Sequence, residues 1–179
     1  GKSYAAVYER EHAPGFRWLH ESFGTNWRML EMQAVIGRIQ LQRMAGWTAT
    51  RTRYAEQIWA ACRSHSALHV PEVPANVQHA HYKCYAYVRP EQLAAGWNRD
   101  RIVAAINALG VPCYQGSCSE VYMEKAFDGT GWRPAAPLPT AHALGTTSVM
   151  FLVHPTLTQA EVDTTCTAIA QVMQQATAA

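Results

Sequence analysis

Apolar residues recur at helical spacing along residues 29–44 and leave only a narrow polar strip of Glu31, Arg38 and Gln42. They form two rows: Leu30, Ala34, Gly37, Leu41 and Met44 in one, and Met32, Ile36 and Ile39 in the other. A helix that is apolar on nearly every side is buried in a protein core or in an interface. The pattern therefore predicts a helix over residues 29–44 and leaves both kinds of burial open.

Three more helices are predicted later in the chain. One spans residues 48–63, beyond Gly46, and another follows Asn98, a suitable N-cap, and stops at Gly110. Thr158 and Glu161 form a capping box at the head of the last helix. The apolar stripes of the three are Tyr54, Ala55, Ile58, Ala61 and Cys62; Ile102, Val103, Ile106 and Leu109; and Val162, Cys166, Ile169 and Val172.

Short strands are predicted between these helices. Residues 81–88 alternate, with Tyr82, Cys84, Ala86 and Val88 on one face and His81, Lys83, Tyr85 and Tyr87 on the other. Residues 111–114 are a second strand candidate, and the apolar run 148–153 suits a buried strand. Between them lies a long loop with one helical turn over 120–127. The order of elements predicts an α/β fold, of the α+β sandwich-like kind, with helices packed on a small sheet.

Composition narrows the class of protein. The chain has 179 residues, a net charge of +2 and five cysteines at irregular spacing. This charge gives no reason to expect a nucleic acid or a membrane surface as a partner, and the cysteines do not form a disulfide framework. No long apolar run and no apolar leader are visible in the sequence. We therefore expect a cytoplasmic protein that contacts neither nucleic acid nor membrane.

Histidines and cysteines raise two candidate sites, and both are weak. His79 and His81 would share one face of a strand while Cys84 points to the other, and no second ligand pair follows at a zinc-like spacing. Cys113 and Cys118 flank four residues and so do not form a redox pair of the usual spacing. We expect no metal site and two buried or pocket-lining thiols.

Asn26 and Arg28 lie at the start of the helix predicted over residues 29–44. An amide, a guanidinium and free backbone N–H groups at a helix N-terminus make a good anion site. The alternative is that Thr25 or Asn26 only caps the helix and that Arg28 is solvated. The residue types alone leave both interpretations open.

The stretch GTNWRMLEMQAVIGRIQLQRM, residues 24–44, resembles a sequence block of the DegT/StrS-type sugar aminotransferases. These are pyridoxal-phosphate (PLP) enzymes of the aspartate-aminotransferase fold. Arg51 and Tyr54, the strand over 110–114 and the segment 152–163 also resemble the C-terminal half of the family. The matching residues of the block are Gly24, Asn26, Arg28, Met29, Glu31, Gln33, Ala34, Gly37, Gln40 and Leu41.

The resemblance implies a fold, a cofactor site and a partner. It implies the small C-terminal domain of the aspartate-aminotransferase fold, with helices packed on a mostly antiparallel sheet. It also implies that Asn26 contacts the PLP phosphate of the partner subunit, with Arg28 supporting the phosphate or the substrate. The helix over 29–44 would then lie between its own domain and a second subunit of a homodimer.

The family's Schiff-base lysine is not found in this chain. The lysines are Lys2, Lys83 and Lys125, and none lies in the family's lysine motif. Transamination needs that amine both as the covalent anchor and as the base that moves the proton. The resemblance therefore implies that this lysine precedes Gly1, and that the chain alone neither turns over substrate nor binds PLP.

The substrate loop departs from the family pattern. Many members have two histidines in a strand and loop that follow a GI or GV turn, and here the corresponding run is CYQGSCSEVY, residues 113–122. The tyrosines are kept but the histidines are replaced, so we expect an unusual substrate pocket. Its candidate residues are Tyr114, Ser117, Cys118 and Glu120, and an ordinary structured loop is the alternative.

These features lead to one functional prediction and one rival. The first is the C-terminal portion of a PLP-dependent aminotransferase that acts on a nucleotide-linked keto-sugar, in amino-sugar biosynthesis, with glutamate as the donor. The rival is a non-catalytic, dimerising or regulatory module built on the same half-fold. The expected division is an N-terminal arm or remnant of the large domain over 1–24, a long helical interface and linker over 25–64, and a small C-terminal α/β domain over 65–179.

Overall fold

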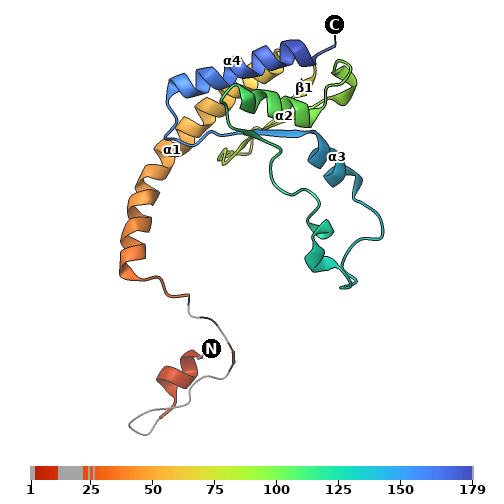
Figure 1. Cartoon of the computed structure of the whole chain (residues 1–179). Coiled ribbons are helices and arrows are strands. Elements are labelled where there is room, and N and C mark those ends of the chain that lie inside the picture. The colour runs from red at the N-terminus through yellow and green to blue at the C-terminus, as the bar shows by residue number, and fades with distance from the viewer. Residues whose placement is uncertain (1–2, 12–21, 24, 26, 179) are drawn as a thin grey trace. The chain divides into compact units, whose positions relative to one another are not determined.

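The computed structural model describes residues 3–11, 22–23, 25 and 27–178 (Figure 1). The chain divides into two units, Gly1–Gln42 and Arg43–Ala179, which are considered separately. The first contains a π-helical turn, Ala5–Glu9, and the beginning of the long helix α1, Glu31–Arg63. The second contains the remainder of α1, the sheet and every other helix of the described chain.

Helix α1 is one continuous helix of 33 residues, so the prediction of two helices separated at Gly46 is wrong. A glycine in a helix interior costs only about 1 kcal/mol relative to alanine, and no proline is present to remove a hydrogen bond. Nothing in the described chain lies within 4 Å of where a Cβ at Gly37 or Gly46 would be. No described residue therefore makes the backbone contact expected at Gly37.

The C-terminal half of α1 is part of the hydrophobic core. The apolar pattern predicted that Ala61 is buried, but Ala61 is only half-buried. Trp59, which the predicted stripe did not include, is buried. The polar atoms of its aromatic side chains are bonded to backbone: Tyr54 donates to Leu157 O at 2.8 Å, and Trp59 Nε1 donates to Tyr85 O at 2.9 Å. The buried residues of the helix are Tyr54, Ala55, Ile58, Trp59 and Cys62.

The sheet has four strands in the order β1-β2-β4-β3, and every pairing is antiparallel. This confirms the prediction of a small, mostly antiparallel sheet. The two-residue strand β1 was not anticipated from the sequence, and β2 begins at Cys84, so the prediction that residues 81–83 belong to the strand is wrong. The strands are β1 Leu68–His69, β2 Cys84–Val88, β3 Cys113–Tyr114 and β4 Ser148–Phe151.

Helices cover one face of this sheet (Figure 1). Helix α2, Arg99–Ala108, is capped as predicted: Asn98 Oδ1 accepts from Arg101 N at 2.9 Å. Helix α4, Gln159–Ala176, begins with the predicted capping box of Thr158 and Glu161. Both helices pack on the buried strand residues together with the end of α1.

The opposite face of the sheet is polar and aromatic. In β2, Cys84, Ala86 and Val88 are buried while Tyr85 and Tyr87 between them are half-buried. Tyr85 pairs with Met150, which also pairs with Tyr114 of β3. Because directly paired residues of antiparallel strands share a face, Tyr85 and Tyr114 lie on the side away from the helices.

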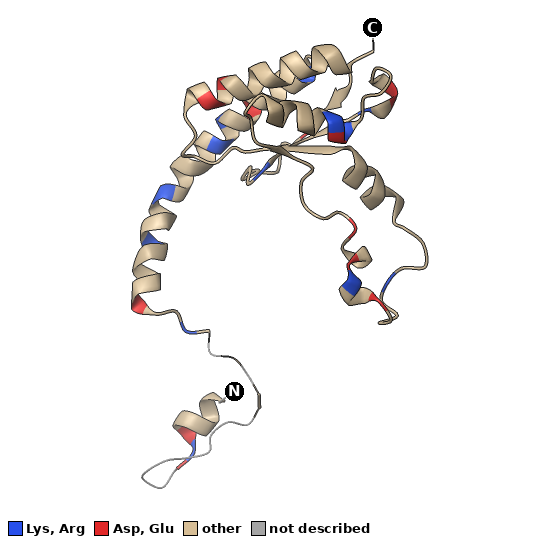
Figure 2. Ribbon diagram, viewed as in Figure 1, with Lys and Arg blue, Asp and Glu red and all other residues tan. Residues whose placement is uncertain are grey.

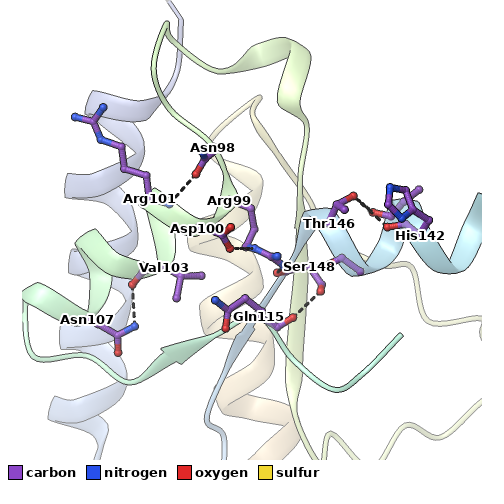
Figure 3. Close-up of polar contacts among 12 residues, drawn as sticks. Asn98, Arg99, Asp100, Arg101, Val103, Asn107, Gln115, His142, Thr146 and Ser148 are labelled. Carbon is purple, nitrogen blue, oxygen red and sulfur yellow. Dashed lines mark hydrogen bonds and ion pairs between the residues drawn. The ribbon is translucent and has the colours of Figure 1, made fainter. Parts of the chain in front are cut away.

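Helix α3, Pro139–Thr147, leads directly into β4 and was not recognised in the sequence. Arg99 holds its end in place, since Arg99 Nη1 donates to Gly145 O and to Ser148 O, each at 2.9 Å. Arg99 Nε is paired with Asp100 at 2.7 Å (Figure 3). Hydrogen bonding by this guanidinium is the main reason that the pKa of Asp100 is lowered.

Lys and Arg are dispersed over the elements, and α4 has acidic residues near its start and no basic ones (Figure 2). Acidic side chains near a helix N-terminus interact favourably with the helix dipole. None of the helices in the described ranges is both long enough and apolar enough to cross a membrane.

Asn107 provides a test of how α2 is fastened to the sheet (Figure 3). Its amide nitrogen donates to Val103 O at 2.8 Å and to Cys113 O at 2.7 Å, and its oxygen accepts from Cys113 N at 3.2 Å. Asn107→Ala should lower the free energy of unfolding by about 1–3 kcal/mol, because it leaves these groups of β3 without partners. Urea unfolding of the full-length protein measures this, with the exposed Gln174→Ala as control; equal midpoints for the two variants would contradict it.

Candidate functional site

The residues at the start of α1 line a shallow, open hollow in the N-terminal unit. Its volume is about 490 Å³, and its lining is Thr25, Trp27, Arg28, Met29 and Gln33. Gln33 Oε1 accepts from Leu30 N at 3.0 Å, and Trp27 Nε1 donates to Thr25 Oγ1. Asn26, the other residue predicted to bind the cofactor, lies outside the described residues.

The hollow has the chemistry of an anion site. Arg28 supplies a guanidinium whose several N–H donors match the oxygens of a phosphate or carboxylate. The first backbone N–H groups of α1 and the positive end of its dipole add to the attraction. The sequence-based expectation for Arg28 is therefore compatible with its surroundings, and its role stays a prediction.

The predicted pocket residues of the second unit fall into two separate clusters. Ser117 lies with Lys83 and Tyr85, and Glu120 lies with Tyr122 and His142. Tyr114 and Cys118 are exposed and belong to neither cluster. The loop that follows β3 is thus fixed at two points instead of forming one constellation.

The first group, which we call the Lys83 cluster, consists of Lys83, Tyr85 and Ser117. Lys83 Nζ donates to Ser117 Oγ at 3.0 Å, and Ser117 N donates to Tyr85 Oη at 3.1 Å. Gly116 has φ of 100°, and a Cβ there would lie 2.5 Å from Tyr85 Cε1. Glycine is therefore needed for both the backbone conformation and the close approach of the ring.

The second group, the Glu120 cluster, consists of Glu120, Tyr122 and His142. Tyr122 Oη donates to Glu120 Oε1 at 2.7 Å, and His142 Nδ1 lies 3.0 Å from Oε2. A carboxylate only accepts hydrogen bonds, so Nδ1 of His142 holds the proton in this contact. The Tyr122 bond, followed by the His142 bond, lowers the pKa of Glu120, and the bond to Glu120 raises the pKa of Tyr122.

Further contacts fix the loop around these clusters. Arg133 Nε donates to Tyr122 O at 2.8 Å, and Arg133 forms an ion pair with Asp128 at 2.6 Å. Ser148 Oγ donates to Gln115 O at 2.6 Å, which fastens the start of the loop to β4 (Figure 3). The helical turn predicted over 120–127 is present as two short turns, Val121–Met123 and Lys125–Phe127.

The remaining histidines and cysteines do not form a metal site in the part of the chain that is described. His81 is buried with a left-handed φ of 45°, and its backbone N–H donates to His79 Nδ1 at 2.9 Å. Burial raises the pKa of the Cys113 thiol to about 12, which disfavours the reactive thiolate. Of the predicted pair of thiols, Cys113 is buried and Cys118 is exposed.

Sequence reasoning missed Lys83, Tyr85 and His142 as neighbours of the loop. The alternation in residues 81–88 did indicate that Lys83 and Tyr85 share a face. Nothing in the sequence showed that this face meets residue 117, 34 positions after Lys83. His142 was hidden because helix α3 itself was not recognised.

Comparison with known proteins gives one family and several solved structures. The model of the DegT/DnrJ/EryC1/StrS aminotransferase family matches residues 7–170. A search of curated proteins found no match. An aminotransferase from Psychrobacter cryohalolentis is 59% identical, with a TM-score of 0.87; the match covers 97% of this chain and 46% of that one.

More distant structures share the fold. DesV from S. venezuelae, solved in complex with a ketimine intermediate, is 19% identical with a TM-score of 0.72, covering 94% of this chain and 42% of that one. Spr1654 from Streptococcus pneumoniae, solved in a PLP form, is 17% identical with a TM-score of 0.64. The match covers 82% of this chain and 36% of that one. The chain thus spans less than half the length of each of these proteins.

Gly116→Ala tests the contact between the loop and the sheet. The substitution should lower the free energy of unfolding by about 1–3 kcal/mol, because it combines an unfavourable φ with a clash against Tyr85. Gly131→Ala is the matched control, since Gly131 has a φ of 74° and nothing within 4 Å of its Cβ position. Urea unfolding of both variants measures the difference, and an equal cost at the two glycines would refute the contact.

Glu120→Gln tests the Glu120 cluster through pH. The pKa of Glu120 is lowered in the folded protein from its ordinary value of 4.5, so the stabilisation is present above pH 4.5 and lost as the pH falls through the folded pKa. The variant should therefore lose less stability than the wild type as the pH falls below 4.5. Unfolding curves over this range measure it, with Glu124→Gln, on the same loop, as control. Parallel curves for wild type and Glu120→Gln would contradict the assignment.

Proposed function

Because the chain belongs to the DegT/DnrJ/EryC1/StrS aminotransferase family, we propose that it is the C-terminal part of a PLP-dependent aminotransferase. The proposed acceptor is a nucleotide-linked keto-sugar, and the proposed amino donor is glutamate. The observation that supports this most directly is the family match along most of the chain. The block of residues 24–44 agrees with it, because it combines a helix start that suits an anion with an apolar helix.

The residues near the start of α1 fit the phosphate of PLP. Arg28 lines a hollow at the N-terminus of a long helix, and anions bind favourably there. We assign phosphate binding to Asn26 and Arg28, in the site of the partner subunit. When bound, PLP supplies an electron sink for the carbanion formed at the amino-bearing carbon. The lysine that it requires is proposed to belong to a part of the enzyme outside this chain, since none of the three lysines here lies in the family's lysine motif.

The loop after β3 is proposed to form the sugar side of the pocket. Its fixed geometry supports this, because a site held by several hydrogen bonds is preorganised for a ligand. Glu120 holds Nδ1 of His142, so Nε2 is the ring nitrogen that can accept a hydrogen bond from a sugar hydroxyl. His142 would thereby stand in for the histidines that this loop lacks.

A homodimer is proposed through the N-terminal half of α1. Its large apolar side chains are 44–75% exposed, which is unusual for a helix of a soluble enzyme. Gly37 has open space where another backbone would come close. A second copy of the helix would cover this surface and bring Arg28 into the partner's site. The exposed residues are Leu30, Met32, Val35, Ile36, Ile39, Leu41 and Met44.

The experiment is to add PLP to the protein made from its full natural reading frame and to reduce it with borohydride. We expect a visible absorption band and a labelled lysine upstream of Gly1. Absence of both would favour the rival, a non-catalytic module with the same fold.

Asn26→Ala in that protein should weaken retention of PLP, because it removes an amide donor to the phosphate. The expected loss is about 1–2 kcal/mol, or five- to thirtyfold in the dissociation constant. Dialysis followed by the absorption spectrum measures retention, and Gln42→Ala on the polar strip of the helix is the control. Equal retention by Asn26→Ala and the wild type would remove Asn26 from the cofactor site.

A further inference from the structure

We propose that Lys83, positioned by Ser117 and Tyr85, binds an anionic group of a substrate, either a carboxylate or a phosphate. The inference rests on the proposed function and adds to it Lys83, which directly precedes β2 and lies outside the loop motif. It begins from the surroundings of the lysine side chain.

Lys83 has a half-buried side chain with little to balance its charge. Its ammonium has three N–H donors, and its hydrogen bond in the described structure goes to Ser117 Oγ at 3.0 Å. The ammonium also lies 5.7 Å from the centre of the Tyr82 ring. Within the described ranges, no carboxylate lies within ion-pair distance of it.

The acidic residue of the loop that is closest to Ser117 in sequence is already engaged. Glu120 accepts from Tyr122 and His142, so both of its oxygens are used within its own cluster. The ammonium of Lys83 has no counter-ion among the described residues, and an anionic ligand would supply one. Lys83 therefore has both free donors and a reason to bind an anion.

The cluster also provides neutral groups around the ammonium. Tyr85 Oη lies 3.4 Å from Ser117 Oγ and accepts from Ser117 N at 3.1 Å. Gly116 allows the loop backbone to approach Tyr85 of β2, and this keeps Ser117 beside that strand. An anion bound at Lys83 could thus accept from the Ser117 hydroxyl as well, and the exposed Cys118 lies next to it in the chain.

The proposed function offers two sources for the anion. Glutamate and its keto acid carry two carboxylates, and a nucleotide-linked sugar carries a diphosphate. Both match an ammonium with hydroxyl neighbours, so the structure assigns the chemical class and the experiment must separate the sources.

The test is isothermal titration of the full-length protein with 2-oxoglutarate and, separately, with uridine diphosphate. Lys83→Met should weaken one of them about tenfold, the loss of one charge-assisted hydrogen bond, and Lys83→Arg should restore most of the affinity. Lys125→Met removes the same charge from an exposed position of the loop after β3 and should change neither. The ligand whose binding is weakened by Lys83→Met is the source of the anion.

The titration measures binding and not turnover, so the test of Lys83 does not depend on the Schiff-base lysine. Binding of both ligands to Lys83→Met within twofold of the wild type would overturn the proposal, as would a wild type that binds neither. If Lys83→Met does not fold, Ser117→Ala takes its place and should weaken the same ligand severalfold. Borohydride trapping tests the proposed function separately, so the two can fail independently.

Discussion

One-sided packing of the sheet determines the rest of this structure. The buried strand residues, the second half of α1, α2 and α4 share one hydrophobic core, and the helices lie on a single face of the sheet. Tyr85 and Tyr114 are thereby left on the other face, and the loop after β3 is fastened to Tyr85. The loop has a fixed position only because β2 and β4 already do.

The same constraint divides α1 into two functional halves. Its C-terminal half has Ile58 and Cys62 wholly buried in the core, while its N-terminal half leaves Met32 75% exposed. The C-terminal half of the helix thus belongs to the core, and the N-terminal half has an apolar, exposed surface. Burial of apolar area is the main favourable term in association, so such a surface is stable only when something covers it. In our account a second subunit does so.

Local patterns in the sequence predicted the elements that depend on neighbouring residues. The caps at Asn98 and Thr158 are confirmed because a cap is a contact between residues three positions apart. The alternation in β2 was visible from Cys84 onward for the same reason. Helix α3 was missed because it is short and has no side-chain cap. The break at Gly46 was wrong because a glycine inside a helix costs only about 1 kcal/mol.

The candidate site was less predictable because it depends on contacts between distant residues. The sequence indicated Ser117 and Glu120, but Lys83 and His142 join them only through the order of the strands. Asn26 lies outside the described residues, and its assignment stays a prediction, as does the domain boundary at residue 64. The family block, in contrast, was recognisable because its residues are contiguous.

The central claim is that the N-terminal half of α1 is a subunit interface, and sedimentation of the full-length protein tests it most directly. The account predicts a dimer at micromolar concentration that Ile36→Glu combined with Ile39→Glu converts to a monomer. Gln42→Glu, on the polar strip of the same helix, should leave the dimer intact. A monomeric wild type, or a double variant that remains dimeric, would contradict the account.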